Sequence, residues 1–153
     1  MPGSLTHSPA VVVKHLLVAL SQGTLPENDG SWPVYATQEP TKPDSTITVY
    51  DTTGITGDRD TPTNERPENN GIQVRVKSPN YAAGYTKSSA IALAMDGVTK
   101  NAVNIPDATG TGSTDYTVWT VIRTSDVLSL GKESPTSRRD LFTINALVSL
   151  RQA

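Results

Sequence analysis

Residues 138–150 of the chain, RRDLFTINALVSL, carry the most informative strand pattern in the sequence. From Phe142 to Leu150 every even position is apolar, whereas Thr143, Asn145 and Ser149 stand among the odd positions. A period of two is expected when one face of a β-sheet is buried and the other is exposed. The segment therefore predicts an amphipathic strand near the end of the chain, and we expect the long polar stretches elsewhere to be loops attached to a compact sheet.

The chain of 153 residues has the size of one domain. A domain of this length buries roughly 70% of the surface that its unfolded chain exposes, so it needs no covalent cross-link to fold. The sequence contains no cysteine, which excludes disulfides, thiolate metal sites and cysteine nucleophiles. We expect a single domain over residues 1–153, with a flexible start at residues 1–7.

Charge and hydropathy limit the partners of the chain. Thirteen Lys and Arg against fifteen Asp and Glu give a formal net charge of −2, and no basic cluster indicates specific recognition of duplex nucleic acid. The longest apolar segment, Ala10 to Leu20, contains Lys14 and His15 and is too short to span a bilayer. Residues 1–9 lack the basic residues of a signal peptide. We expect a soluble protein without a cleaved leader or a membrane partner.

Two helices are predicted. Ser8 can cap a helix whose first residue is Pro9, and the apolar residues that follow predict a helix over about 9–22 with a stop at Gly23. A second helix is expected to open with Ser78-Pro79 and to run to about Gly97. Its many alanines would let it lie close against a sheet, whereas Gly84 is expected to weaken its first turns.

Alternating or β-branched residues predict five strands before the last one, at 32–37, 46–52, 72–76, 102–105 and 116–122, and the fourth of these has the weakest signal. Adjacent strands that are joined by turns favour antiparallel pairing. The predicted fold class is therefore α+β, a mainly antiparallel sheet with two helices packed on it in a single-domain sandwich.

A long polar stretch, residues 53–70, is predicted to be an exposed loop, and loops of this length are usually functional or disordered. Its Asp58-Arg59-Asp60 run is the main concentration of carboxylates in the chain and could in principle hold a hard cation. The spacing of a calcium-binding loop is missing, and Arg59 and Arg66 offset the negative charge. We therefore expect Asp58, Arg59, Asp60 and Arg66 to contact a subunit or partner, with no metal and no cofactor.

Other polar residues give little support to catalysis. Both histidines lie in the first fifteen residues, and the chain has no Gly-x-Ser-x-Gly nucleophile elbow. The glycines near residue 110 lack the lysine and the helix of a phosphate loop. Trp32 and Trp119 are expected to pack in the core or in an interface. Arg75 lies on the sheet face opposite the apolar residues of its strand, where it is either exposed, ion-paired or in contact across a subunit boundary. No catalytic residue is predicted.

In order and spacing, the segments resemble the minor capsid and tail terminator proteins of long-tailed bacteriophages. The residues that carry the resemblance are Trp32–Tyr35, Pro43-Asp44 leading into Ile47–Thr52, Gly71–Val76, the helix from Tyr81 through Leu93, and Arg139–Asn145. Together they cover most of the chain from residue 8 onward, and no single motif among them is specific.

The resemblance implies a structural virion protein of the tail and neck and not an enzyme. Similar proteins have a helix-plus-sheet fold and form a hexameric ring that caps the finished tail tube and provides the surface on which the head docks. The implied partners are further copies of the chain, the tail tube protein and a head-tail connector or neck protein, and the genome would pass through the lumen. Assembly would occur in the host cytoplasm.

Three alternatives remain open from the sequence. The chain could be another neck or head-completion minor capsid protein of the same particle. It could also be a small module that binds calcium, a sugar or a peptide through the Asp58 loop, or a hydrolase that uses the same carboxylates.

For the ring interpretation, heterologous contacts need two different complementary patches on each subunit, and a chain this polar suits a subunit that is soluble before it assembles.

Overall fold

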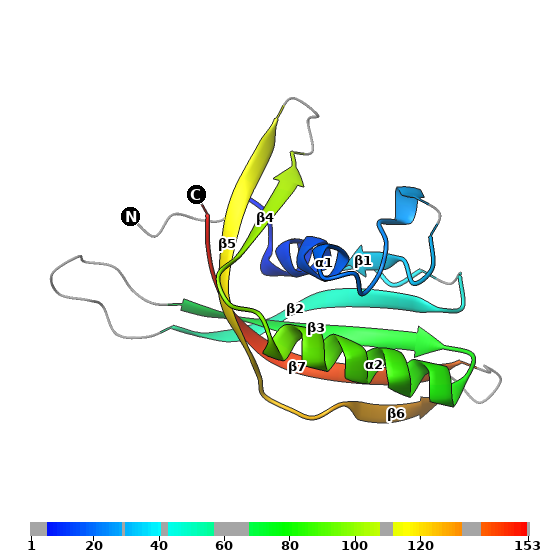
Figure 1. Cartoon of the computed structure of the whole chain (residues 1–153). Helices are drawn as coiled ribbons and strands as arrows, with labels where there is room; N and C mark the ends of the chain where they lie inside the picture. Colours follow the sequence, from blue (N-terminus) through cyan, green and yellow to red (C-terminus); the bar gives the residue numbers. More distant parts are fainter. Residues whose placement is uncertain are drawn as a thin grey trace, which may run out of the picture.

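The computed structural model describes residues 6–28, 30–40, 43–56, 68–107, 112–132 and 139–152. About half of these residues form a β-sheet, and two helices pack on it (Figure 1). In chain order the elements are α1 (Pro9–Ala19), the short 3-10 turn η1 (Pro26–Asn28), β1 (Val34–Ala36), β2 (Thr46–Thr56), β3 (Glu68–Ser78), α2 (Tyr81–Asp96), β4 (Asn101–Pro106), β5 (Ser113–Arg123), β6 (Leu128–Lys132) and β7 (Asp140–Gln152).

The last strand, β7, lies at the centre of a seven-stranded sheet. The strand order is β1-β2-β3-β7-β5-β4, and β6 pairs with the first residues of β7 on the same side as β5. Phe142, Ile144, Ala146 and Val148 are buried on one face of β7, as their even positions predict. The predicted amphipathic strand is thus confirmed, and it is the strand that joins both halves of the sheet.

The sheet is mixed, so the prediction of antiparallel pairing holds only in part. All strand pairs are antiparallel except β1 and β2, which run parallel with Val34 opposite Ile47. Parallel neighbours cannot be joined by a tight hairpin. The polar segment after β1 runs back along one face of the sheet to the start of β2. A linker rich in proline and charge is compatible with this path and with a hairpin, so the sequence does not distinguish the two.

Both helices cover the same face of the sheet. Register places Ile47, Val74, Ile144 and Phe142 on one face, because directly opposed residues of antiparallel strands share a face. α2 packs on this face at Phe142, and α1 is tied to it through Asp51, whose Oδ1 accepts the Ala10 N–H at 2.9 Å. The result is a helix layer on one curled sheet, in which β4 and β5 rise away from the plane of the other strands (Figure 1). The opposite side of the sheet is called the open face below.

α1 is shorter than predicted. Ser8 caps it and Pro9 is its first residue, as expected, but the helix ends at Ala19 and not near Gln22. Gly23 does not terminate it. A Cβ at Gly23 would lie 2.5 Å from the Trp32 carbonyl oxygen, so this glycine permits the close approach of the chain that leads into β1.

α2 begins at Tyr81, two residues after the Pro79 that the sequence indicates as its opening. Its N-cap is Asn80, whose side chain accepts the N–H groups of Ala82 and Ala83. Gly84 is buried against the sheet, and a Cβ there would lie 2.6 Å from the Phe142 ring. The predicted weak point of the helix is therefore a position where α2 packs directly against the sheet.

In the polar parts of the chain, both ends of the expected loop were predicted wrongly, and one strand was missed. The loop expected over residues 53–70 is paired strand at both ends, because β2 continues to Thr56 and β3 begins at Glu68, with a register shift after Thr52. The sequence also gives no signal for β6, all of whose residues are exposed. The strand with the weakest signal, residues 102–105, is confirmed as β4.

Candidate assembly surface

The predicted contact residues fall into two groups. Asp58, Arg59, Asp60 and Arg66 belong to residues 57–67, which lie outside the described residues. Arg75 lies on β3 with its side chain on the open face, opposite in parity to the buried Val74 and Val76. Its Nη1 is 3.3 Å from Glu39 Oε2, and its guanidinium lies over the Tyr50 ring at 5.6 Å. The ion-paired interpretation of Arg75 is confirmed, whereas a contact across a subunit boundary stays a prediction.

The partner of Arg75 belongs to the segment that joins β1 to β2, which we call the strap (residues 37–40 and 43–45). The strap crosses the open face over β3, where Lys77 Nζ donates to the Pro40 carbonyl oxygen at 2.6 Å. Its far end is near the start of β7, where Arg139 Nη1 lies 3.5 Å from Asp44 Oδ1. The strap therefore shields part of the open face and fully buries Lys77.

The surface beneath the strap is polar. Thr46, Thr48 and Lys77 are buried there, in contrast to the apolar residues under the helices. Among the described residues, no hydrogen-bond partner is found for Thr46 Oγ1, Thr48 Oγ1, Glu39 Oε1 or Arg75 Nε. Burial raises the pKa of the Tyr50 hydroxyl above its ordinary value, and the Glu39 carboxylate raises it further while Arg75 opposes this. The described contacts of the strap with the sheet thus include the Arg75–Glu39 and Arg139–Asp44 ion pairs and the hydrogen bond from Lys77 to Pro40.

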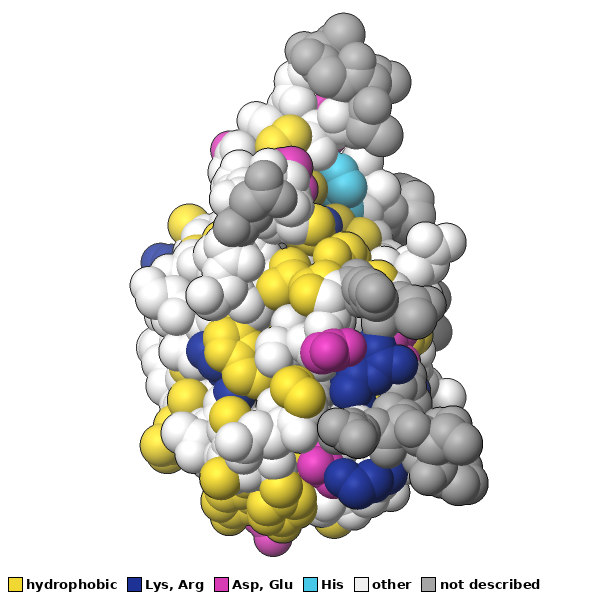
Figure 2. All heavy atoms as spheres, turned by 90° about the vertical axis from the view of Figure 1, so that its right-hand side faces the viewer, with side chains coloured by type: hydrophobic (Ala, Val, Ile, Leu, Met, Phe, Trp, Pro, Cys, Tyr) yellow, Lys and Arg dark blue, Asp and Glu magenta, His cyan; other side chains and the backbone are white. Residues whose placement is uncertain are grey.

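Two tyrosines form an exposed aromatic site at the start of α2, which we call the tyrosine patch (Tyr81 and Tyr85). They are one helical turn apart and stack with ring centroids 6.4 Å from each other, while both rings contact the buried Phe142. Tyr81 is 54% exposed and Tyr85 is 50% exposed. Phe142 pairs with Ser129, so the exposed leucines of β6, Leu128 and Leu130, lie at the same end of the molecule. Figure 2 shows hydrophobic side chains gathered at this lower end, at the level of α2 and β6 in Figure 1.

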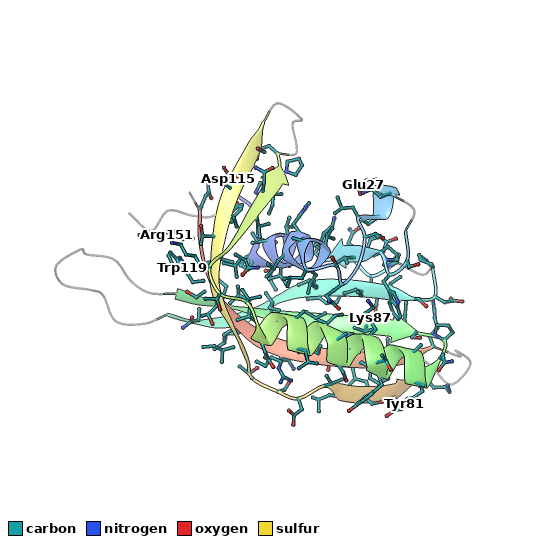
Figure 3. All side chains as sticks on the ribbon, viewed as in Figure 1. Glu27, Tyr81, Lys87, Asp115, Trp119 and Arg151 are labelled. Carbon is teal, nitrogen blue, oxygen red and sulfur yellow. The ribbon has the colours of Figure 1, made fainter. Side chains whose placement is uncertain are left out.

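A second exposed apolar site lies on β5, and its Ile122 is on the part of the open face that the strap does not cover. We call it the tryptophan patch (Trp119 and Ile122). Trp119 is 43% exposed and Ile122 is 53% exposed. Ile122 lies opposite the half-buried Leu147 of β7, and Lys100 Nζ lies 5.4 Å from the Trp119 ring centroid. Figure 3 shows Trp119 and Tyr81 on opposite sides of the molecule.

An irregularity in β5 creates the tryptophan patch. The alternation from Tyr116 to Ile122 predicts that both residues share a face, but Tyr116 is buried and Ile122 is exposed. The register with β7 shifts between Val118 and Thr120, which inserts Trp119 as an extra residue. Such a bulge reverses the parity of every following residue, so that Val121 instead of Ile122 faces the core. Sequence alternation carries no signal for this shift.

The edges of the sheet are poorly suited to pairing with another strand. The outer edge of β1 is bridged by Thr24, whose O accepts the Val34 N–H at 2.9 Å. β4 ends in Pro106, and β6 is short, has a register shift and ends in Lys132. Proline, irregularity and lysine are features that protect an edge strand from association. Any contact with another protein is therefore expected through faces and side chains and not through an added strand.

The start of the described chain is held to the end of the sheet. His7 donates its backbone N–H to the Tyr116 hydroxyl at 2.8 Å, and its ring lies edge-on to the Tyr116 ring. Thr6 N–H donates to Gln152 Oε1 at 2.9 Å, and Gln152 Nε2 donates back to Thr6 Oγ1. Residues 6 and 7 are thus part of the packed structure, although the sequence predicts a flexible start.

The described residues contain no group of three or more His, Cys, Asp or Glu side chains that could hold a metal ion. The carboxylates considered for a cation, Asp58 and Asp60, lie outside these residues. Within the same residues, no helix has the length and apolar character needed to cross a membrane.

Residues 17–129 match the family described as bacteriophage tail terminator protein. The match covers more than half of the chain, and the chain therefore belongs to this family, which is one of structural phage tail proteins found in the virion. No curated protein matches the chain. The resemblance drawn from the order of the sequence segments is thereby confirmed at the level of the family.

Proposed function

We propose that this tail terminator protein closes into a ring of six copies that caps the tail tube and joins the tail to the neck of the particle. The ring covers the growing end of the tube and blocks the addition of further tube subunits. It then presents its other side to the connector or neck protein, and assembly takes place in the host cytoplasm. Membership of the tail terminator family supports the role in the tail.

The observation that carries the ring is the presence of two separate exposed aromatic sites on a well-packed domain. Tyrosine and tryptophan are enriched in protein interfaces, where their large apolar surfaces supply most of the binding energy. The tyrosine patch and the tryptophan patch differ in composition and lie on different sides of the subunit. A closed ring uses heterologous contacts, which need two different patches on every subunit.

The charged residues Asp58, Arg59, Asp60 and Arg66 belong, in this proposal, to the contact with the tube or the connector. They lie in the chain between the ends of β2 and β3, and this hairpin extends past the last residue pair between β3 and β7. Charged side chains contribute specificity and rate of association more than affinity. Arg75 would support the same contact by holding the strap in place through Glu39.

Tail length is the direct test of the proposed function. Removing the protein from a phage assembly system should give overlong tails, because nothing would stop the addition of tube subunits. Purified protein added to growing tubes should stop their growth and appear as a ring at tube ends in negative-stain images. Tails of normal length without the protein would contradict termination and would favour another role in the neck or in head completion.

A further inference from the structure

We propose that the strap is a releasable cover, which opens from the open face of the sheet while the rest of the domain stays folded. In the closed form that the structure shows, the strap lies over Thr46 and Thr48 of β2, and opening exposes both side chains to water. The proposal concerns a motion within one chain and does not depend on the proposed ring.

The strap places no side chain of its own in the core. None of its described residues, 37–40 and 43–45, is buried. Its contacts with the sheet include the two ion pairs and the hydrogen bond given above. Water can take the place of either partner in such contacts, so their net contribution to stability is modest. Opening would therefore separate polar groups without exposing a buried apolar side chain of the strap.

The closed strap leaves polar atoms beneath it without partners. Thr48 lies directly opposite Arg75 on β3, and Arg75 holds Glu39 of the strap. Thr46 lies opposite Lys77 in the same way, and both threonines are fully buried. Among the described residues, no hydrogen-bond partner is found for either threonine hydroxyl, for Arg75 Nε or for Glu39 Oε1. A buried polar group without a partner costs free energy, which is recovered when water reaches the group. These four atoms therefore favour opening.

The backbone at the start of the strap is strained. Thr37, its first described residue, has a φ of 68°. A β-branched residue rarely adopts this left-handed conformation, which persists only where the surrounding structure enforces it. The Thr37 N–H donates to the Val49 carbonyl oxygen at 2.9 Å, so the strained residue is held against β2. Opening would let Thr37 return to an ordinary conformation, which makes it the hinge of the strap at its β1 end.

Cysteine labelling of the folded protein tests the opening. The chain has no cysteine, so Thr48→Cys places a single thiol beneath the strap. Val49→Cys is the matched control, because Val49 is the next residue of β2 and is equally buried, but on the helix-covered face. Reaction with a small aromatic disulfide measures how often each thiol becomes accessible. We expect Thr48→Cys to react at least about tenfold faster than Val49→Cys, at a rate that low concentrations of urea change little.

The dependence on urea separates local opening from unfolding of the whole domain. Equal rates for the two thiols, rising together with urea, would show that Thr48 is reached only by global unfolding, and this result would overturn the proposal. Thermal unfolding checks the fold of each variant. Thr46→Cys with Ile47→Cys forms a second pair with the same arrangement, which gives the same comparison if Thr48→Cys does not fold.

A substitution in the strap identifies the contact that breaks on opening. Glu39→Gln removes the charge that Arg75 binds, and we expect it to raise the labelling rate of Thr48→Cys by the same factor as the equilibrium constant for unfolding in urea. This equality holds only if the ion pair is absent from the labelled form. A labelling rate that stays unchanged while the domain is destabilised would mean that the strap remains bound when Thr48→Cys reacts, and it would contradict the proposal.

Discussion

At the scale of single residues, Gly84 shows how one missing side chain sets the distance between α2 and β7. A Cβ at this position would approach Phe142 Cε2 to 2.6 Å and Ser78 Cβ to 3.1 Å. Overpacking costs about 1–3 kcal/mol, whereas replacing a helical glycine by alanine gains about 1 kcal/mol. We expect Gly84→Ala to lower the free energy of unfolding by up to about 2 kcal/mol in urea titrations.

Gly97 provides the matched control for this prediction. It caps the end of α2 with a φ of −87°, and the nearest atom to an added Cβ is the Ala94 carbonyl oxygen at 3.6 Å. Gly97→Ala should therefore leave stability nearly unchanged. Equal effects of the two substitutions would mean that contact with Phe142 does not set the packing of α2.

His15 gives a prediction about pH. Burial lowers its pKa below the ordinary value of 6.5, the charge of Lys14 and the nearby His7 lower it further, and Glu27 opposes them. Below pH 6.5 the unfolded chain binds a proton that the folded chain does not, so stability should fall as the pH decreases toward the folded pKa. From pH 7.5 to 5.5 we expect the melting temperature to drop by up to about 3 °C more in wild type than in His15→Gln. Parallel profiles for the two proteins would show that His15 does not contribute.

At the scale of structural elements, the strap depends on a charged contact above a polar surface. Arg75 and Glu39 are 30% and 16% exposed, which leaves their ion pair only partly screened by solvent. A double-mutant cycle with Glu39→Gln and Arg75→Met should give a coupling of about 1–2 kcal/mol in the free energy of unfolding. Lys132, whose side chain is 55% exposed, and Asp140 form a control pair with a longer separation of 3.6 Å, for which we expect less than about 1 kcal/mol. A coupling no larger than that of the control pair would argue that the strap is held by its other contacts.

Among the elements, those with local sequence signals were predictable, whereas pairings between distant segments were not. Alternation predicted β7, and capping residues predicted the start of α1, because both signals are local. The parallel pairing of β1 with β2 and the shift at Trp119 depend on contacts between distant segments. The tyrosine patch had a local signal in two tyrosines at helical spacing, but the sequence alone did not show that Phe142 lies beneath them.

At the scale of the whole molecule, the family and the broad layout of helices on a sheet were predictable from the order and spacing of the segments, although no single motif is specific. The predicted contact residues Asp58, Arg59, Asp60 and Arg66 lie outside the described residues, so their role stays a prediction. The exposed apolar residues on α2, β5 and β6 form a surface of different physical chemistry, and we expect it to respond differently to salt.

Salt should affect the two surfaces differently. Interactions between exposed charges are screened over about 3 Å at 1 M ionic strength, whereas apolar contacts are not weakened by such screening. We therefore expect the mass of the proposed ring to stay constant between about 0.1 and 1 M NaCl, while binding to tail tubes weakens several-fold. A variant with Arg59→Ala and Arg66→Ala should bind tubes weakly at low salt and lose little more at high salt. Dissociation of the ring at high salt, with tube binding unchanged, would reverse the assignment and make the charged loop the subunit contact.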